Sequence, residues 1–349
     1  MIGSVARWLR RRSEQSGPGG DPVADFWSWW RGSGAATLAG AFDTGRVDGV
    51  AQLIEPRVRA IHPGLAWEFA PGALSRHALT VTADGDPALR RTARRWLQAA
   101  PDADTTWSFH DLRQPGTLDV TLDIGGVHVA LDGTTVAAER HGTSLDVVVH
   151  HPAFPGLDEE GRLRVTFLAL DAVLGEELVE LWLGTVATSE TPPPHSRPLG
   201  ELPRLLAPVV ADAMPEGEMG WALLHGTTEA GPAIAIARNR LAPVQAPLLS
   251  QVATVVVPFT DRTPSGLPEE PTLEALRALE DDLITAVGRH GMLLATETCG
   301  GTRWLHFAVD PDAECADVLR SGVAGWPQGQ ANVDTTDDPS WETVAHLRG

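Results

Sequence analysis

The residues best suited to chemistry or recognition lie on one predicted β-hairpin near the C-terminal end of the chain. Strand-forming residues fill positions 292–298 and 302–309, and the pair Gly300-Gly301 between them predicts a two-residue turn. Because side chains alternate between faces along a strand, this turn gathers five polar or aromatic side chains on one face. They are Glu297, Cys299, Thr302, Trp304 and His306. We predict that this face is a binding surface.

Two alternatives for this face stay open at the level of sequence. The opposite face, with Leu294, Leu305, Phe307 and Val309, is expected to be core. Another part of the chain could cover the polar face, which would make Trp304 a core residue as well. The other alternative is a small-molecule site between the two domains, with Glu297, Arg303 and His306 as its working residues and His306 acting as acid or base near neutral pH.

A second group of candidates is a cluster of arginines on a predicted helix, residues 86–100, which Asp86-Pro87 begins. Arg90, Arg91, Arg94 and Arg95 are expected on its exposed side, opposite Trp96. Such a patch can bind a phosphate or an acidic partner. The interpretation we favour is a solvated face that is paired with nearby acids.

Neither a catalytic pair nor a metal site emerges from the remaining titratable residues. The acids Asp171, Glu176, Glu177 and Glu180 lie close together in sequence, and we interpret them as a solvated helix end. Two cysteines cannot supply a four-thiolate site. The adjacent pair His150-His151 would point to opposite faces of a strand. We therefore predict no cofactor, no metal and no catalytic residue.

The composition excludes several classes of activity. The chain has 349 residues and a formal net charge of −19, and all 27 of its cationic residues are arginine. The absence of lysine excludes a Walker A phosphate site and a Schiff base to pyridoxal phosphate. The acidic balance argues against nucleic-acid binding. RNA-recognition sheets do carry aromatics where Trp304 and His306 lie, but the glycines and the second aromatic of that signature are missing.

The sequence predicts an α+β protein of two domains. Residues 1–24 form a basic N-terminal segment with a flexible linker, residues 25–188 an N-terminal α+β domain, and residues 189–200, with three consecutive prolines, a second linker. The N-terminal domain is expected to contain a β meander over 117–152 and further strands at 162–170 and 177–187. Residues 201–349 form the C-terminal domain. Its order β-α-β-β-α-β over 252–334 predicts a ferredoxin-like split βαβ unit.

The second half of the chain resembles the uncharacterised bacterial family known as domain of unknown function 695, from about residue 221 to 346. The resemblance rests on IAIARN (234–239), GLP (266–268), LEDDL (279–283), the T-x-x-GGTR hairpin and DDPSW (337–341). It implies a small α+β module, found at times beside a domain similar to the B-type regulator of ribonuclease E. The closing DGWG-type motif of that regulator is absent here, and no catalytic residues come with the family.

These observations favour a non-enzymatic module that binds or regulates a macromolecular partner, most simply a protein. The alternative is a small-molecule-binding protein or enzyme with its site between the two domains, near His306 and Glu297. No stretch approaches the roughly 18 apolar residues that a membrane span needs. With no signal peptide and no disulfide framework in the sequence, we expect a cytoplasmic protein.

Overall fold

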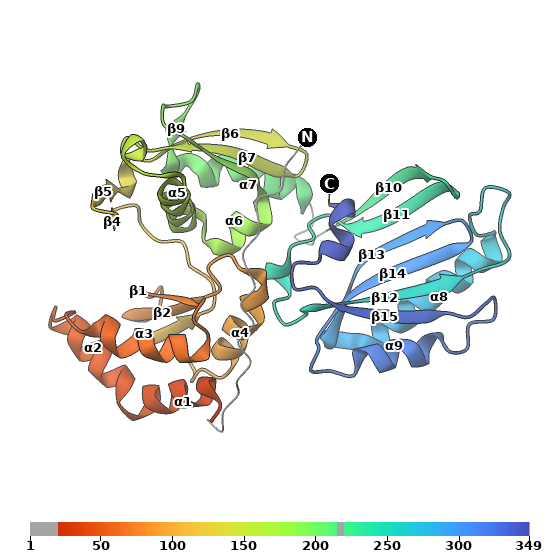
Figure 1. Cartoon of the computed structure of the whole chain (residues 1–349), viewed down its shortest axis with the longest axis horizontal. Helices are drawn as coiled ribbons and strands as arrows, with labels where there is room; N and C mark the ends of the chain where they lie inside the picture. The colour runs from red at the N-terminus through yellow and green to blue at the C-terminus, as the bar shows by residue number, and fades with distance from the viewer. Residues whose placement is uncertain (1–19, 215–219, 349) are drawn as a thin grey trace.

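The structure is a computed structural model that describes residues 20–214 and 220–348, so most of the predicted basic segment 1–24 lies outside it. Figure 1 shows three structural units in chain order, which we call the first unit (21–111), the middle unit (112–214) and the C-terminal unit (220–348). The predicted α+β class is confirmed. None of the helices in the described ranges combines the length and the apolar character that crossing a membrane requires.

The first unit packs helices against a small sheet around an aromatic core. Its sheet has the order β1-β2-β3, with β1 and β2 antiparallel and β2 and β3 parallel. Phe26, Trp27 and Trp96 are buried in the core, where the rings of Trp27 and Trp96 stack with centroids 4.8 Å apart. The elements are α1 (Pro22–Trp29), η1 (Trp30–Gly34), α2 (Ala35–Asp43), α3 (Val50–Ile61), β1 (Ala66–Ala70), β2 (His77–Thr82), α4 (Pro87–Gln98) and β3 (Trp107–His110).

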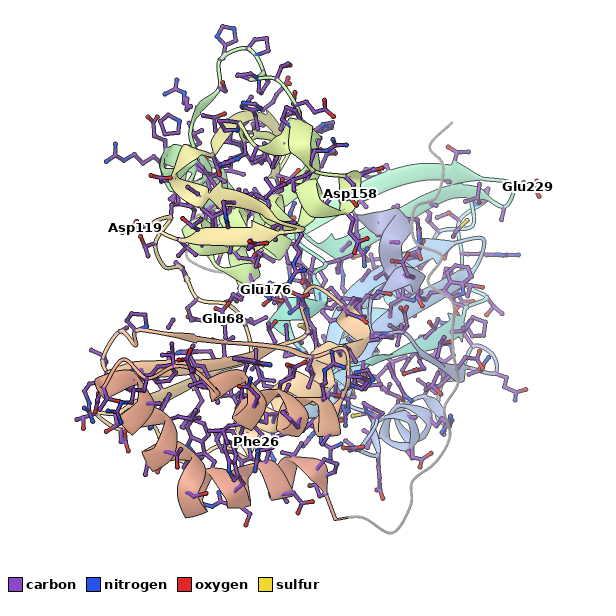
Figure 2. The ribbon with its side chains drawn as sticks, turned by 60° about the vertical axis from the view of Figure 1, so that its left-hand side comes forward. Phe26, Glu68, Asp119, Asp158, Glu176 and Glu229 are labelled. Carbon is purple, nitrogen blue, oxygen red and sulfur yellow. The ribbon has the colours of Figure 1, made fainter. Side chains whose placement is uncertain are left out.

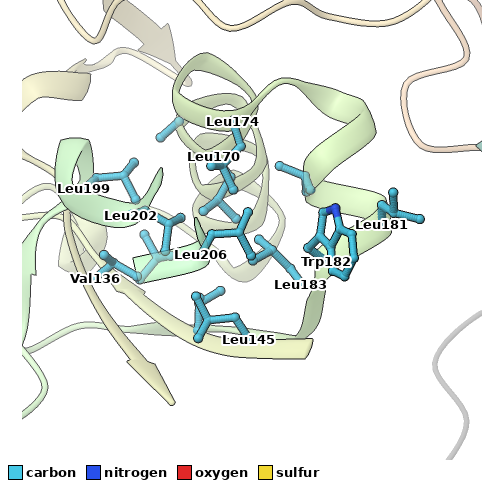
Figure 3. Close-up of a cluster of buried hydrophobic side chains, with 14 of the residues drawn as sticks. Val136, Leu145, Leu170, Leu174, Leu181, Trp182, Leu183, Leu199, Leu202 and Leu206 are labelled. Atoms are coloured by element: carbon cyan, nitrogen blue, oxygen red, sulfur yellow. The ribbon is translucent and has the colours of Figure 1, made fainter. Parts of the chain in front are cut away.

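The middle unit has a four-stranded sheet, β8-β7-β6-β9, and a separate two-stranded hairpin, β4-β5. Figure 3 shows its core, in which leucines of the helices meet Val136 and Leu145 of the sheet. The elements are β4 (Thr121–Ile124), β5 (Val127–Ala130), η2 (Leu131–Gly133), β6 (Thr135–His141), β7 (Ser144–His150), η3 (Phe154–Gly156), α5 (Glu159–Leu174), α6 (Glu176–Trp182), β8 (Leu183–Ser189), β9 (Arg197–Pro198), η4 (Leu199–Glu201) and α7 (Leu202–Ala213).

Two strand predictions in this unit are wrong. Residues 162–170 belong to helix α5, which Asp158 caps by accepting a hydrogen bond from the Gly161 amide at 2.8 Å. Val165 and Ala169 are both buried, and this four-residue spacing is helical. The predicted strand at 177–187 begins as α6, and only its second half is strand β8.

The proline-rich segment 189–200 does not separate two cores. Strand β9 pairs with β6, so the chain returns to the middle sheet after the prolines. Leu202 and Leu206 of α7 are buried in the same cluster as Leu170 of α5 (Figure 3). Helix α7 therefore packs into the core of the middle unit and not with residues 220–348, as the predicted domain 201–349 required.

The C-terminal unit is a six-stranded antiparallel sheet of order β10-β11-β13-β14-β12-β15. Helices α8 and α9 cover one face (Figure 1), and Trp341, Val344 and Leu347 cover part of the other. The elements are β10 (Trp221–Thr228), β11 (Gly231–Arg238), η5 (Pro243–Gln245), β12 (Gln251–Pro258), α8 (Glu270–Val287), η6 (Gly288–His290), β13 (Gly291–Cys299), β14 (Thr302–Val309), α9 (Cys315–Val323), β15 (Asn332–Asp337) and η7 (Glu342–Leu347).

The β13–β14 hairpin forms as predicted. Cys299 lies opposite Thr302. The turn glycines Gly300 and Gly301 have φ angles of 57° and 85°, which residues with a side chain rarely adopt. Glu297 lies opposite Trp304, as the turn required. The local turn chemistry therefore sets the register of the candidate surface.

Candidate functional site

The predicted binding residues do share one face of the C-terminal sheet. We call this set, Glu297, Cys299, Thr302, Trp304 and His306, the Trp304 surface. It is the face opposite α8 and α9, because Leu305 and Phe307 between these residues point into the core under the helices. Thr302 and Trp304 are half-buried, whereas Cys299 and His306 are buried.

His306 links the central strands of this surface. Its Nε2 lies 3.0 Å from Oε1 of Glu297 on β13, and its Nδ1 lies 3.2 Å from the hydroxyl of Thr254 on β12. If the Thr254 hydroxyl donates to Nδ1, Nε2 carries the proton and donates to the carboxylate. This hydrogen bond lowers the pKa of Glu297 below its usual value, against the opposing effect of burial. Glu297 is therefore a carboxylate that is held in place and ionised.

The C-terminal segment reaches the same carboxylate. Nε2 of His346, in η7, lies 3.1 Å from Oε1 of Glu297. Trp341 packs beside this contact with no exposed surface, and its indole N–H donates to the Leu249 carbonyl at 3.1 Å. One end of the sheet face is thus covered, and Trp304 lies beyond the covered part.

Cys299 is a free cysteine, but its thiol is not exposed on this surface. Its Sγ lies 3.0 Å from the Thr228 hydroxyl on the neighbouring hairpin, and only 9% of the residue is exposed. Cys315 is also free and buried, on α9. Neither cysteine lies in a group that could bind a metal, and in the ranges 20–214 and 220–348 no set of three His, Cys, Asp or Glu residues is so placed.

Two residues do not lie where the sequence interpretation needed them. Arg303 lies on the helix-covered face, where it donates to the Thr298 hydroxyl at 3.0 Å and approaches Glu280 of α8 at 3.7 Å. It therefore cannot act together with His306. Leu294, predicted in the core under the helices, packs instead with Trp341, because a bulge between Leu293 and Ala295 shifts the alternation by one residue.

The arginines of the predicted patch are paired with acids, as in the interpretation we favoured, and Arg95 is exposed, but Arg90 is not on a solvated face. Arg90 is 3% exposed, and its guanidinium binds Glu176 at 3.2 Å and also Glu180. The other three arginines are paired with acids as well. They bind Asp310 and Asp312 (Arg91), Asp111 (Arg94) and Asp312 (Arg95). The patch thus joins the first unit to the middle and C-terminal units, because its acidic partners lie in all three.

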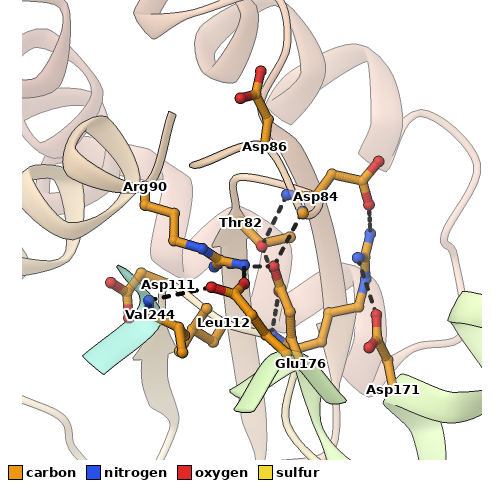
Figure 4. Close-up of polar contacts among 12 residues, drawn as sticks. Thr82, Asp84, Asp86, Arg90, Asp111, Leu112, Asp171, Glu176 and Val244 are labelled. Carbon is orange, nitrogen blue, oxygen red and sulfur yellow. Dashed lines mark hydrogen bonds and ion pairs between the residues drawn. The ribbon is translucent and has the colours of Figure 1, made fainter. Parts of the chain in front are cut away.

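A buried ionic cluster between the first and middle units is a feature that the sequence analysis missed (Figure 4). Glu176 lies at its centre and accepts hydrogen bonds from the Thr82 hydroxyl, the Gly85 amide, Arg90 and the Arg113 amide. Figure 2 shows Glu176 near Glu68 where the two units meet. The prediction of a solvated helix end is therefore wrong for Glu176, which is 4% exposed.

Arg113 holds the rest of the cluster together. Its guanidinium approaches Asp84 at 2.6 Å, Glu68 at 3.3 Å and Asp171 at 3.4 Å. Burial raises the pKa of Asp171 to about 7, and the charges of Glu176 and Glu68 add to this effect while Arg113 opposes it. Burial also raises the pKa of Glu68. The cluster has more carboxylates than guanidinium groups, so it binds a proton readily. The signal in the sequence was a set of four acidic residues inside an otherwise apolar run, LDAVLGEELVELW (170–182).

A cavity of about 420 Å³ lies where the three units meet. Its charged lining residues are Glu180, Arg240, Glu342 and Arg348. None of the five residues of the Trp304 surface lines this cavity. The sequence analysis expected a site between the domains to lie near His306 and Glu297. In the structure the cavity between the units lies apart from these two residues.

Comparison with known proteins supports the resemblance of the C-terminal part. Residues 220–347 match the model of a family of unknown function, DUF695. No curated protein and no solved structure matches the chain. The family match covers the whole C-terminal unit, including η7 with Trp341 and His346.

Proposed function

We propose that this protein is a non-enzymatic binding module whose Trp304 surface docks a protein partner. The observation that carries the proposal is the position of Trp304, half-buried on a sheet face and outside the cavity between the units. A catalytic or small-molecule site near His306 would need a pocket that excludes water. A tryptophan on an open sheet face instead suits a macromolecular contact, in which aromatic anchors dominate the binding energy.

The charges around Trp304 indicate the kind of partner. Glu297 is ionised and its side chain is 30% exposed, and Asp334 on β15 lies on the same face and is exposed. A nucleic acid would be repelled by these carboxylates. The surface best fits a protein that presents an arginine or lysine next to an apolar contact, since the cation would meet both Glu297 and the face of the Trp304 ring.

The Trp304 surface belongs to a unit whose fold and cellular location are also part of what we propose. We interpret strands β12 to β15 with α8 and α9 as a ferredoxin-like unit, supported by the antiparallel order β13-β14-β12-β15. The hairpin β10–β11 then extends that unit at β13. A cytoplasmic location is supported by the two cysteines, which are both unbridged.

The test is affinity capture from an extract of the native host, with the full chain as bait. We expect a stoichiometric partner that is retained by the wild type and lost with Trp304→Ala. Trp67→Ala, which truncates a half-buried tryptophan of the first unit, is the matched control and should retain the partner. Equal capture by the wild type and Trp304→Ala would refute the assignment of this surface.

A second candidate function is small-molecule binding in the cavity between the units. Its volume, about 420 Å³, lies in the range of ligand pockets. Glu180 and Arg240 would give it both an acceptor and a donor, and burial raises the pKa of Glu180. Screening for ligands that raise the unfolding temperature of the wild type but not of Glu342→Ala would support this function.

A further inference from the structure

The outermost strand of the C-terminal sheet, β10, has a free edge. It pairs with β11 on one side, and no other described strand pairs with it. The amide of Asn239 donates to the Gly220 carbonyl at 3.0 Å, so Gly220 directs its backbone groups toward β11. Because these groups alternate in an antiparallel ladder, Trp221, Leu223, His225 and Thr227 direct their N–H and C=O groups away from β11.

The two edge strands of this sheet differ in how well they are protected against pairing with another strand. At the opposite edge, β15 is short and carries Asp334 and Asp337, and such charges hinder pairing with another strand. Strand β10 is eight residues long and contains no Asp, Glu, Arg or Pro, in a chain with 46 acidic residues. Its edge is therefore open to pairing with another strand.

Apolar side chains are exposed next to this edge. Trp221 and Leu223 on β10 are 44% and 59% exposed, and Ile236, which lies opposite Leu223 on β11, is 40% exposed. All three lie on the face that α8 and α9 cover elsewhere, since Ala235 and Ala237 of β11 point to the other face. Exposed apolar residues that adjoin unpaired backbone are typical of an interaction surface.

We propose that β10 pairs with β10 of a second copy of this chain, antiparallel and about a two-fold axis at Leu224. The outward-pointing residues then form the hydrogen-bonded pairs, with Leu223 opposite His225 of the partner subunit and Trp221 opposite Thr227 of the partner subunit. Leu224 faces its own counterpart on the axis. Both sheets join into one, which closes the two free edges against each other.

Charge complementarity supports a second copy as the occupant. The strand itself brings no charge to the seam, so two acidic chains meet there without like-charge contacts. Arg238 lies at one end of β10, with its guanidinium 4.9 Å from the Trp221 ring. Glu229 lies at the other end, at the tip of the hairpin (Figure 2). Antiparallel pairing brings the Arg238 end of each copy toward the Glu229 end of the other.

The two-fold axis has a geometric consequence for the rest of the sheet. It runs perpendicular to the sheet, so equivalent faces of both copies point the same way. The two Trp304 surfaces then lie on one side of the joined sheet. The pairing does not depend on the proposed function, but a partner with two binding sites would gain affinity from it.

The first test is the mass of the full chain in solution, measured by sedimentation equilibrium over a range of concentrations. We expect a reversible dimer with twice the chain mass of 37.2 kDa. Leu223→Lys adds a charge at an exposed edge position and should yield monomer at every concentration. Ile284→Lys, at a 39% exposed position on α8 away from the edge, is the matched control and should remain dimeric. A monomeric wild type, or a Leu223→Lys variant that still dimerises, would overturn the proposal.

The second test reads the register. Opposed residues at a non-hydrogen-bonded pair have Cα atoms about 4.5 Å apart, which a disulfide can bridge. Under mild oxidation Leu224→Cys should therefore form a covalent dimer. In the same pairing the two copies of Thr227 are about 20 Å apart, so Thr227→Cys should stay uncrosslinked. Crosslinking of Thr227→Cys, or none with Leu224→Cys, would overturn the proposed register.

Discussion

The protonation of Asp171 should make the stability of this protein depend on pH near neutrality. Asp171 is 5% exposed at the contact between the first and middle units, and its pKa rises from 3.8 to about 7. The folded protein therefore binds a proton that the unfolded chain releases. Between these two pKa values the contribution of Asp171 becomes less favourable as the pH rises, and below about 3.8 the effect disappears.

The size of the effect follows from the shift. Each pKa unit corresponds to about 1.36 kcal/mol, so a shift of about 3 units makes ionised Asp171 unfavourable by about 4 kcal/mol above pH 7. From about pH 5 to about pH 8 the change amounts to roughly 2–3 kcal/mol.

The perturbation that tests this reasoning is Asp171→Asn, which removes the charge and keeps the shape. We expect the variant to be more stable than the wild type at about pH 8, with the difference shrinking toward pH 5. Urea unfolding at a series of pH values, followed by tryptophan fluorescence, measures that difference. Asp212→Asn is the control, because Asp212 is 62% exposed in a surface pair with Arg140 and should give a small difference that is flat with pH.

The reasoning would be refuted by a difference between Asp171→Asn and the wild type that does not change with pH. That result would mean that Asp171 is ionised in the folded protein at pH 5, so that Arg113 at least offsets the effect of burial on its pKa. A difference that grows as the pH falls would have the same meaning. Either outcome would also show that the ionic cluster holds no extra proton on Asp171 near neutral pH.

Further substitutions test the faces of the sheet and the ionic contacts. Phe307→Ala should lower the free energy of unfolding by about 3–5 kcal/mol, and Trp304→Ala by less than half as much, in urea melts of the full chain. Glu176→Ala should cost about 3–5 kcal/mol in the same assay, because it leaves buried Arg90 with only Glu180 as an acidic partner and removes the acceptor of the Thr82 hydroxyl. Glu297→Gln should remove part of the loss of stability on acidification, since the lowered pKa of Glu297 stabilises the fold above its unfolded value of 4.5; melts at acidic and neutral pH check this.

The sequence was sufficient where short-range chemistry decides the structure. The β13–β14 hairpin follows from a glycine pair between two alternating segments, and its register placed Glu297 opposite Trp304 as predicted. The bulge at Leu294 was not predictable in this way, because it adds one residue without a glycine or proline to mark it. Alternation therefore assigned the turn-proximal residues correctly and failed beyond the bulge.

The sequence was insufficient where distant segments decide the structure. Residues 162–170 have the composition of a strand, yet they form a helix because burial at Val165 and Ala169 outweighs intrinsic preference. Arg90 and Glu176 are 86 positions apart, so no local pattern could pair them. A run of arginines and a run of acids each resembled a solvated face, and only folding brings the two together.

Arginine is well suited to the contacts between the units. Arg91 donates to the Leu248 carbonyl at 2.6 Å and to Asp310 at 2.8 Å, and so ties the first unit to the C-terminal unit with one side chain. Arg240 likewise reaches the Leu181 carbonyl at 2.7 Å from its Nε, across to the middle unit. A planar group with five donors can bind partners from separate segments at once, whereas a lysine ammonium is a compact point charge with stronger hydration. Since these junctions bury the side chains between units, weaker hydration lowers the cost of desolvation, and arginine is the cation that suits them.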